Sequence, residues 1–324
     1  TALGATAIVV AVVAFLTGSP STTDAIDVAH GPGVVGLTVV GGHPTDVGAR
    51  EGGVIVTDGE GGHIAHVDPA TGELVSSLPL ANDATEVAFG HDTAWIGDPS
   101  RGEIFQFDPR TDQLVQDPIE LGGPAPSMSI SVASPDKLWV VLGQQLLTVN
   151  TQTREVTHIG AARQPVDVAA ELGTVWVLDG AEGLLRLDPD TGRQIGDAIP
   201  TPGKSGDGDV YAGAGTIWVG DRGDNTLVRV DPDTGAFLGT VRLDGYYLDL
   251  AFDSNAVWAL SRTTGTTAEL TALDLESAES IGEPLEIQGG AVEVATGAGS
   301  VWVALKDEGA VLKIDPQPFL DARR

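Results

Sequence analysis

Six tryptophans recur at intervals of roughly 40 residues, and this spacing limits the possible folds more than any other feature of the chain. They are Trp95, Trp139, Trp176, Trp218, Trp258 and Trp302. One interval earlier, GVIVTD at residues 53–58 matches TAWIGD at residues 93–98 and places Ile55 at the tryptophan position. The chain therefore contains seven copies of one unit, and periods of this length are typical of solenoids and propellers.

A turn motif recurs in phase with the tryptophans. It reads DPATG, DPRTD, NTQTR, DPDTG twice, DLESA and DPQ, and begins at Asp68, Asp108, Asn150, Asp188, Asp231, Asp274 and Asp315. Asp accepts hydrogen bonds from the amides that follow it, Pro presets φ, and Gly adopts the left-handed conformation that closes the turn. We interpret these residues as part of the fold and not as a functional site.

The pattern within one copy distinguishes a propeller from a solenoid. The fourth copy contains four short β-rich runs, at residues 166–170, 174–178, 184–187 and 193–198, which we call strands a, b, c and d. Four strands per copy is the pattern of a propeller blade. The sequence thus predicts an all-β fold, a seven-bladed β-propeller of four-stranded blades, over residues 34–316, with each tryptophan packed between blades.

The two ends of the repeat region are complementary. The last copy has predicted strands at 291–296, 300–305 and 311–314 but no fourth strand, whereas a lone run, VVGLTVV, occupies residues 34–40 before the first copy. We expect this N-terminal strand to complete the last blade, because closure hides two exposed strand edges. Deleting residues 34–40 should then destabilise the ring more than removing the residues after Asp315.

Residues 1–18, TALGATAIVVAVVAFLTG, carry no charge. A run of this kind is typical of an export signal or a membrane anchor. Because no basic region or clear cleavage site precedes or follows it, we favour a hydrophobic helix that anchors an extracytoplasmic propeller in the cell membrane. Residues 19–33 would be a linker and residues 317–324 a tail.

The composition excludes several classes of function. Formal net charge is -29, from 46 acidic and 17 basic residues, and such a surface repels nucleic-acid phosphates and anionic lipid headgroups. We therefore expect no nucleic-acid partner and no membrane contact except through the N-terminal helix. There are no cysteines, and no phosphate loop or hydrolase motif is present, so the sequence offers no candidate catalytic residue.

Carboxylates begin strand a in six of the seven copies. They are Asp46, Glu86, Asp167, Asp209, Asp249 and Glu293, and the third copy has Ser131 instead. Because strand a is innermost in a propeller, these positions should form a ring around the central channel. The b–c hairpins open on the same face and add Asp58, Glu60, Asp98, Asp179, Asp221, Asp224, Asp307 and Glu308, which predicts an acidic mouth.

Two interpretations of the ring are open. The six carboxylates are candidate ligands for Ca²⁺, the only cofactor we consider, or for a cationic ligand group, since hard cations take oxygen ligands. Alternatively, each carboxylate accepts backbone hydrogen bonds and joins one blade to the next, as buried polar groups require partners.

Histidines and tyrosines supply two further candidates. His43 and His91 lie in predicted loops near the first two ring carboxylates, whereas His63 and His66 should point to opposite faces of a strand and are a poor ligand pair. Three longer loops, LGGPAPSMS, TPGKSGDGD and RLDGYYLD, connect strand d to the next strand a. The last contains Tyr246 and Tyr247, which form a candidate contact patch for a sugar or peptide unless one of them packs inward.

The segment DRGDNTLVRVDPDTGAFLGTVRL, residues 221–243, resembles the YVTN-type β-propeller repeats of bacterial surface and periplasmic proteins. The repeated VWV and IWV, each followed by a strand that ends in Asp-Pro, are similar to the virginiamycin B lyase-like propellers. The resemblance covers residues 34–316 and implies the fold more than any activity. The lyase of that group is implied to use a metal with His and Glu from late blades, but the last histidine here is His158.

Three functions follow as hypotheses. The first is a membrane-anchored binding or scaffold module that contacts a protein or carbohydrate partner on its acidic face. The second is the sensor ectodomain of a receptor, for example a receptor kinase. The third is a metal-dependent enzyme of the lyase or lactonase propeller type.

Overall fold

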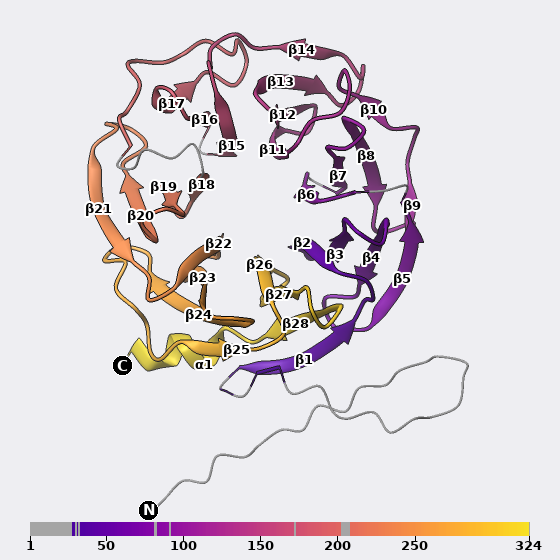
Figure 1. Ribbon diagram of the computed structural model, residues 1–324, viewed down its shortest axis with the longest axis vertical. Coiled ribbons are helices and arrows are strands. Elements are labelled where there is room, and N and C mark those ends of the chain that lie inside the picture. Colours follow the sequence, from indigo (N-terminus) through magenta and orange to yellow (C-terminus); the bar gives the residue numbers. More distant parts are fainter. Residues whose placement is uncertain are drawn as a thin grey trace, which may run out of the picture.

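The computed structural model describes residues 28–29, 31, 33–80, 83–90, 92–171, 173–201 and 208–323. In this part of the chain seven antiparallel sheets surround a central opening (Figure 1). The prediction of an all-β, seven-bladed propeller is therefore confirmed. The proposed anchor helix at residues 1–18 lies outside the described residues, and no described helix is long and apolar enough to cross a membrane.

The strands follow the a, b, c, d order around the ring. Strands a, which line the opening, are β2 (Pro44–Arg50), β6 (Glu86–Phe89), β11 (Met128–Ser134), β15 (Pro165–Glu171), β18 (Gly208–Gly213), β22 (Tyr246–Phe252) and β26 (Ala291–Gly297). Strands b are β3 (Gly53–Asp58), β7 (Ala94–Asp98), β12 (Lys137–Leu142), β16 (Thr174–Asp179), β19 (Thr216–Asp221), β23 (Ala256–Thr264) and β27 (Ser300–Leu305). Strands c are β4 (His63–Val67), β8 (Glu103–Asp108), β13 (Gln145–Asn150), β17 (Gly183–Leu187), β20 (Thr226–Val230), β24 (Thr267–Asp274) and β28 (Ala310–Ile314).

The outer strands vary more than the inner ones. They are β5 (Leu74–Pro79), β9 (Gln113–Leu114) with β10 (Ile119–Glu120), β14 (Val156–His158), β21 (Phe237–Arg242), β25 (Leu285–Ile287) and β1 (Val34–Val39). In the fourth blade the strand predicted at residues 193–198 is reduced to two isolated bridges, Leu187 to Gln194 and Leu184 to Ile199. Gly196 lies between them with φ of 73°, which interrupts an extended strand.

Strand β1 lies at the outer edge of the last blade, where it pairs antiparallel with β28, with Leu37 opposite Leu312. The chain after Asp315 also packs on the ring through the short helices α1 (Gln317–Leu320) and η1 (Asp321–Arg323). Phe319 in α1 is 2 % exposed and meets Trp258 edge to face, at 5.4 Å between ring centroids. Removing the residues after Asp315 therefore takes away a buried aromatic side chain. This truncation should destabilise the ring more than the sequence suggested.

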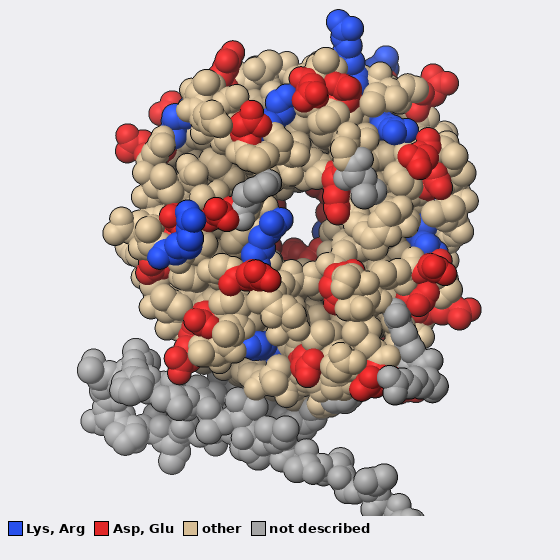
Figure 2. All heavy atoms as spheres, turned by 180° about the vertical axis from the view of Figure 1, so that it is seen from behind, with Lys and Arg blue, Asp and Glu red and all other residues tan. Residues whose placement is uncertain are grey.

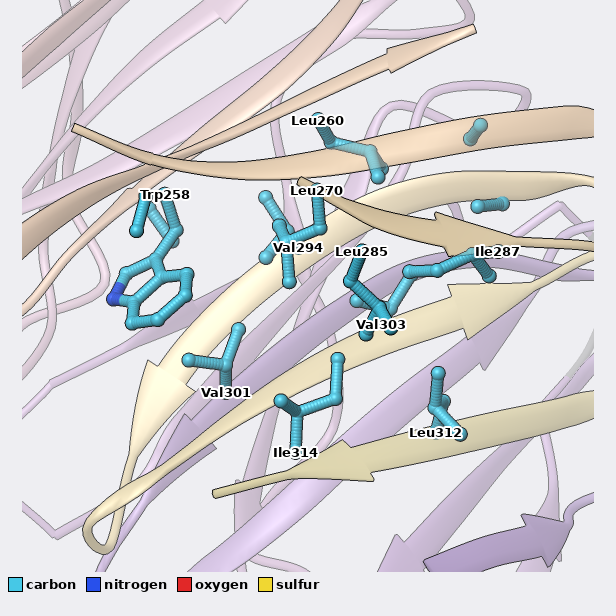
Figure 3. Packing of buried hydrophobic residues seen from close by; sticks show 14 of the residues in the cluster. Trp258, Leu260, Leu270, Leu285, Ile287, Val294, Val301, Val303, Leu312 and Ile314 are labelled. Carbon is cyan, nitrogen blue, oxygen red and sulfur yellow. The ribbon is translucent and has the colours of Figure 1, made fainter. Parts of the chain in front are cut away.

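The core consists of apolar clusters between neighbouring blades. Five of the tryptophans are fully buried: Trp139, Trp176, Trp218, Trp258 and Trp302. Figure 3 shows the cluster between the sixth and seventh blades, where Trp258 and Leu260 of β23 face Val294 of β26 and Val301 of β27. Burial of each large apolar side chain stabilises the fold by about 2 kcal/mol, so the repeated tryptophan accounts for much of the cohesion between blades.

Basic residues on strands c join the blades near their outer turns. Arg186, Arg229 and Lys313 lie over the indole rings of Trp176, Trp218 and Trp302, with cation to ring-centroid distances of 5.7, 5.3 and 5.3 Å. Each also donates to backbone carbonyls in the Asp-containing turn of the next blade. Because Lys313 reaches Pro69 and Ala70, at 2.7 and 3.0 Å, this contact also joins the last blade to the first.

The recurring Asp turns have the structural role that their sequence indicates. Oδ1 of Asp68 accepts the amides of Ala70 and Thr71, both at 2.8 Å, and the Thr71 amide contributes most to lowering the pKa of Asp68. Gly72 closes the turn with φ of 75°. These residues are therefore part of the fold.

Candidate functional site

The six ring carboxylates converge around the channel, as the sequence predicted. They lie on what we call the upper face, where strands a begin and the b–c hairpins turn; the a–b hairpins and the Asp turns lie on the lower face. The pKa of Glu86 is raised well above its usual value, first by burial and then by the charges of four other members: Asp46, Asp167, Asp209 and Asp249. Acidic atoms are visible in the wall of the opening in Figure 2.

Some members of the ring join one blade to the next. Oδ1 of Asp46 accepts the amide of Val47 and Oδ2 accepts the amide of Val87 in the next blade, both at 2.6 Å. Asp167 accepts the amides of its own following residue and of Val210 in the next blade, at 2.8 and 2.7 Å. In the third blade the Oγ of Ser131 accepts the amide of Ala170 at 2.8 Å.

Asp249 makes the corresponding connection between the sixth and seventh blades. Its Oδ2 accepts the amide of Val294 at 2.9 Å, and its Oδ1 accepts the hydroxyl of Tyr211 at 2.8 Å. The structural interpretation of the ring therefore holds for Asp46, Ser131, Asp167 and Asp249. We call these four the stitching residues.

Glu86, Asp209 and Glu293 make no such connection, and we call them the channel acids. Within the described part of the chain, no backbone amide of a neighbouring blade donates a hydrogen bond to any of these three carboxyl groups. Asp209 is ion-paired with Arg222, at 2.8 Å between Oδ2 and Nη2. Glu293 shares a hydrogen bond with Asp249, which helps to raise its pKa after the larger effects of burial and the charge of Asp249.

The ring has too little positive charge to keep every carboxyl ionised. Among the residues that the structure describes, Arg222 is the only basic residue that forms an ion pair with a ring carboxylate. Like charges confined in a partly buried space suppress one another's ionisation. Burial is the main cause that raises the pKa of Asp46 and of Asp209 to about 7. The ring consequently retains protons near neutral pH.

A pair of tyrosines, Tyr247 fully buried and Tyr211 half-buried, packs between the fifth and sixth blades. Tyr247 is fully buried, its hydroxyl donates to that of Tyr211, and Arg222 lies 5.8 Å from its ring centroid. A Cβ at Gly220 would lie 2.4 Å from the ring of Tyr247, so glycine makes room for it. Tyr246 is 43 % exposed. The prediction that both tyrosines form a surface patch is wrong for Tyr247, because it packs inward.

Several hairpin carboxylates do not contribute to an acidic mouth. Four of them are buried and accept hydrogen bonds within their own hairpins: Asp58, Asp98, Asp179 and Asp221. Glu60 is exposed and pairs with Lys306 at 3.1 Å. The upper mouth therefore exposes fewer carboxylates than the count of acidic residues suggested.

No preformed metal site exists in the described part of the chain, because no three Asp, Glu or His side chains gather closely enough to hold an ion. The proposed Ca²⁺ ligands Asp46, Asp167 and Asp249 already accept backbone amides. Because three of the six carboxylates are thus committed to backbone amides, the ring does not offer the converging free oxygen atoms that a hard cation requires.

The histidines are also dispersed. His63 pairs with Asp58 at 3.0 Å and His66 with Asp112 at 3.1 Å, so they face different neighbours, as expected. His43 lies 4.0 Å from Glu60 and does not approach the ring. His91 and loop residues 202–207 lie outside the described residues.

Sequence reasoning missed Arg222 and Tyr211. A signal existed for Tyr211, because it lies two positions after Asp209 on the same strand and alternate residues of a strand share a face. Arg222 follows the b–c hairpin aspartate, and nothing in the sequence places its side chain beside Asp209.

Comparison with known proteins supports the fold alone. No protein-family model matches the chain, and no curated protein matches it. Among solved structures, virginiamycin B lyase from Staphylococcus aureus superposes with a TM-score of 0.68 at 14 % identity, over 84 % of this chain and 94 % of the lyase. The chain has the seven-bladed fold of the virginiamycin B lyases.

Two further structures show how widely this fold is shared. A streptogramin B lyase has a TM-score of 0.66 at 14 % identity, over 86 % of this chain and 94 % of that one. The β-propeller domain of Cps50 (Swd1) from Myceliophteria thermophila has a TM-score of 0.66 at 10 % identity, over 87 % and 98 % of the two chains. Since neighbours this distant include lyases and other proteins, function has to be argued from the site.

Proposed function

We propose that this propeller is a non-enzymatic binding module whose protein or carbohydrate partner inserts a cationic group into the upper mouth of the channel. The observation that carries the proposal is the division of the ring into two kinds of carboxyl. None of Glu86, Asp209 and Glu293 accepts a described backbone amide from the next blade, so an entering group can reach them without breaking the amide bonds that join the blades.

A cationic group would gain affinity here by replacing protons. Burial raises the pKa of Glu86 and of Glu293 well above the usual value, so each holds its proton more strongly than an exposed carboxyl does. An ammonium or guanidinium group close to them favours the ionised form and lowers these pKa values again. Binding should therefore release protons, which separates insertion into the ring from attraction to the acidic surface as a whole.

Isothermal titration calorimetry at about pH 7 tests this, with acetyl-Arg-Arg-amide as the probe and acetyl-citrulline-citrulline-amide as its uncharged counterpart. We expect the measured heat of the arginine probe to depend on the ionisation enthalpy of the buffer, because protons are released. The double variant Glu86→Gln, Glu293→Gln should lose most of this dependence, with Asp209 left to release part of a proton, and should bind about tenfold more weakly.

Glu60→Gln is the matched control, since Glu60 is an exposed carboxylate on the same face but outside the channel. If the arginine probe does not bind, or if Glu60→Gln weakens binding as much as the double variant, the proposal is wrong.

The propeller is proposed to be held outside the cell membrane by residues 1–18. Their lack of charge over a span-length run supports this placement. Protease accessibility of the propeller in intact cells tests it, because a cytosolic domain stays protected. A receptor ectodomain is the alternative within the same location, and the coding sequence upstream of Thr1 distinguishes the two.

An enzyme of the lyase or lactonase type is the second candidate, favoured by the fold shared with virginiamycin B lyase. The channel acids would then supply the general acid or base. A screen of cyclic depsipeptides and lactones for ring opening tests it, with the triple variant Glu86→Gln, Asp209→Asn, Glu293→Gln as control. Activity that the triple variant loses would favour the enzyme.

A further inference from the structure

A second concave site lies on the lower face, at the opposite ends of the inner strands. It is a cavity of about 630 Å³ between the seventh, first and second blades. Its lining includes Ala49, Arg50, Phe89, Asp92, Arg110 and Thr296. Arg50, Phe89 and Thr296 lie at or near the ends of β2, β6 and β26, whereas the ring carboxylates lie at or near the beginnings of inner strands. The cavity is thus separate from the upper mouth.

Arg50 distinguishes this cavity from the rest of a strongly acidic surface. Most basic side chains among the described residues are ion-paired or donate to carbonyls, but the guanidinium group of Arg50 is exposed and has no hydrogen bond or ion pair with another described residue. The charge of Arg50 acts on the carboxyl group of Glu171. Burial raises the pKa of Glu171, and the positive charge of Arg50 lowers it in part. Arg50 therefore presents an uncommitted guanidinium group at the edge of the cavity.

The other walls combine apolar surface with charged side chains, among them Glu51 and Asp92. Arg110 is tied to Asp108, at 3.2 Å between Nε and Oδ1, and to Asp92, at 3.4 Å between Nη1 and Oδ2. Phe89 and Pro109 contribute apolar surface beside it. A concave site of several hundred Å³ that offers both apolar surface and charged groups has room for a small amphipathic molecule.

We propose that this cavity binds a small carboxylate with an apolar body, which is the chemistry shared by a free aromatic acid and by a peptide that ends in an apolar residue. Arg50 takes the carboxylate, because a guanidinium group matches it with two parallel hydrogen bonds. Phe89 and Pro109 contact the apolar body. Glu51 and Asp92 also line the cavity, and the net charge of -29 repels polyanions, so the ligand carries one negative charge. This inference does not depend on the proposed function of the channel.

Calorimetric titration of the full chain with N-acetyl-L-phenylalanine tests the site, with N-acetyl-L-phenylalanine amide as the uncharged counterpart. We expect the acid to bind and the amide to bind at least about tenfold more weakly, because it lacks the charge-assisted bonds. A second pair, acetyl-Gly-Gly-Phe with a free or an amidated C-terminus, distinguishes the sources: tighter binding of this peptide than of the free acid assigns the site to peptide ends.

Arg50→Gln should weaken binding of the acid by about tenfold or more, to the level of the amide. Arg193→Gln is the matched control, because Arg193 is also exposed and without a partner among the described residues but lies outside the cavity. Equal melting temperatures of the two variants show that the fold is intact. Failure of the wild-type protein to bind the acid, equal binding of acid and amide, or equal loss in both arginine variants would overturn the proposal.

Discussion

Asp46 and Glu86 occupy equivalent positions at the starts of neighbouring inner strands, yet they behave differently. Asp46 accepts the amides of Val47 and Val87 and joins two blades, whereas Glu86 accepts no described hydrogen bond and lies among the charges of the ring. Side-chain length explains much of the difference. The short side chain of Asp holds its carboxylate against the backbone, while the extra methylene of Glu places the carboxyl farther from the backbone amides.

The remaining members follow this rule with one exception. Asp167 and Asp249 stitch blades, and Glu293 does not. The exception is Asp209, which is short enough to stitch but is paired with Arg222. One position in the repeat can thus serve stability in one blade and leave a group available for binding in the next, and five substitutions test this contrast.

Asp249→Ala should have the largest effect. It leaves the amide of Val294 and the hydroxyl of Tyr211 without their acceptor in a buried setting, so we expect a loss of about 3 kcal/mol in the free energy of unfolding. Urea denaturation measures it. A loss below about 1 kcal/mol would mean that the stitching bonds contribute little.

The second largest effect is expected when the side-chain lengths of Asp46 and Glu86 are exchanged. Asp46→Glu moves the carboxyl away from both amides and should cost about 2 kcal/mol, whereas Glu86→Asp breaks no described hydrogen bond and should change stability by less than about 0.5 kcal/mol. Thermal and urea denaturation of the reciprocal pair compare them directly. Equal losses would show that length does not separate the two kinds of carboxyl.

Glu86→Gln should stabilise the protein, but only at higher pH. The pKa of Glu86 in the folded protein lies above its unfolded value, so the folded state binds more protons and stability falls as pH rises between the two values. Removing the charge should add about 1 kcal/mol at about pH 8 and little at about pH 5. Asp209 of the wild-type protein acts in the same direction. Because its pKa is raised to about 7 in the folded state, it also lowers the free energy of unfolding as the pH rises from about 4 to about 7. A gain that is the same at both pH values would contradict this.

Ser131→Ala should have the smallest effect. A neutral hydroxyl replaces the carboxylate in the third blade, and its loss removes the acceptor for Ala170 at a cost of about 1 kcal/mol or less. The melting temperature of this variant, compared with that of Asp249→Ala, separates the contribution of the bond from that of the charge. A larger loss than that of Asp249→Ala would reverse the comparison.

Most of the fold could be predicted because it depends on features that repeat. The tryptophan spacing gives the number of blades, and the Asp-Pro-x-Thr-Gly turns locate the strand c to strand d connections. The outer strand of the fourth blade was overpredicted, since Gly196 interrupts a run that otherwise has a strand-like composition. Edge strands are held by one neighbour only, so local residues disturb them most.

The sequence predicted where the carboxyl groups of the candidate site lie, but not which interactions each of them makes. The register of strand a places Asp46, Glu86 and Asp209 at one rim, but whether a carboxyl meets an amide, an arginine or another carboxyl depends on the adjacent blade. Tyr247 is the plainest case, because its burial requires the space beside Gly220 on the neighbouring blade.

The sequence alone determined the number of blades, the residues that line the channel and the turns that connect the strands, because these follow from periodicity along one chain. Only the tertiary structure decided which carboxyls stitch blades, which keep protons in the channel, and that the guanidinium group of Arg50 lies in a cavity of the lower face without a partner among the described residues. Those properties arise between blades, where groups far apart in sequence compete for the same hydrogen bonds and charges.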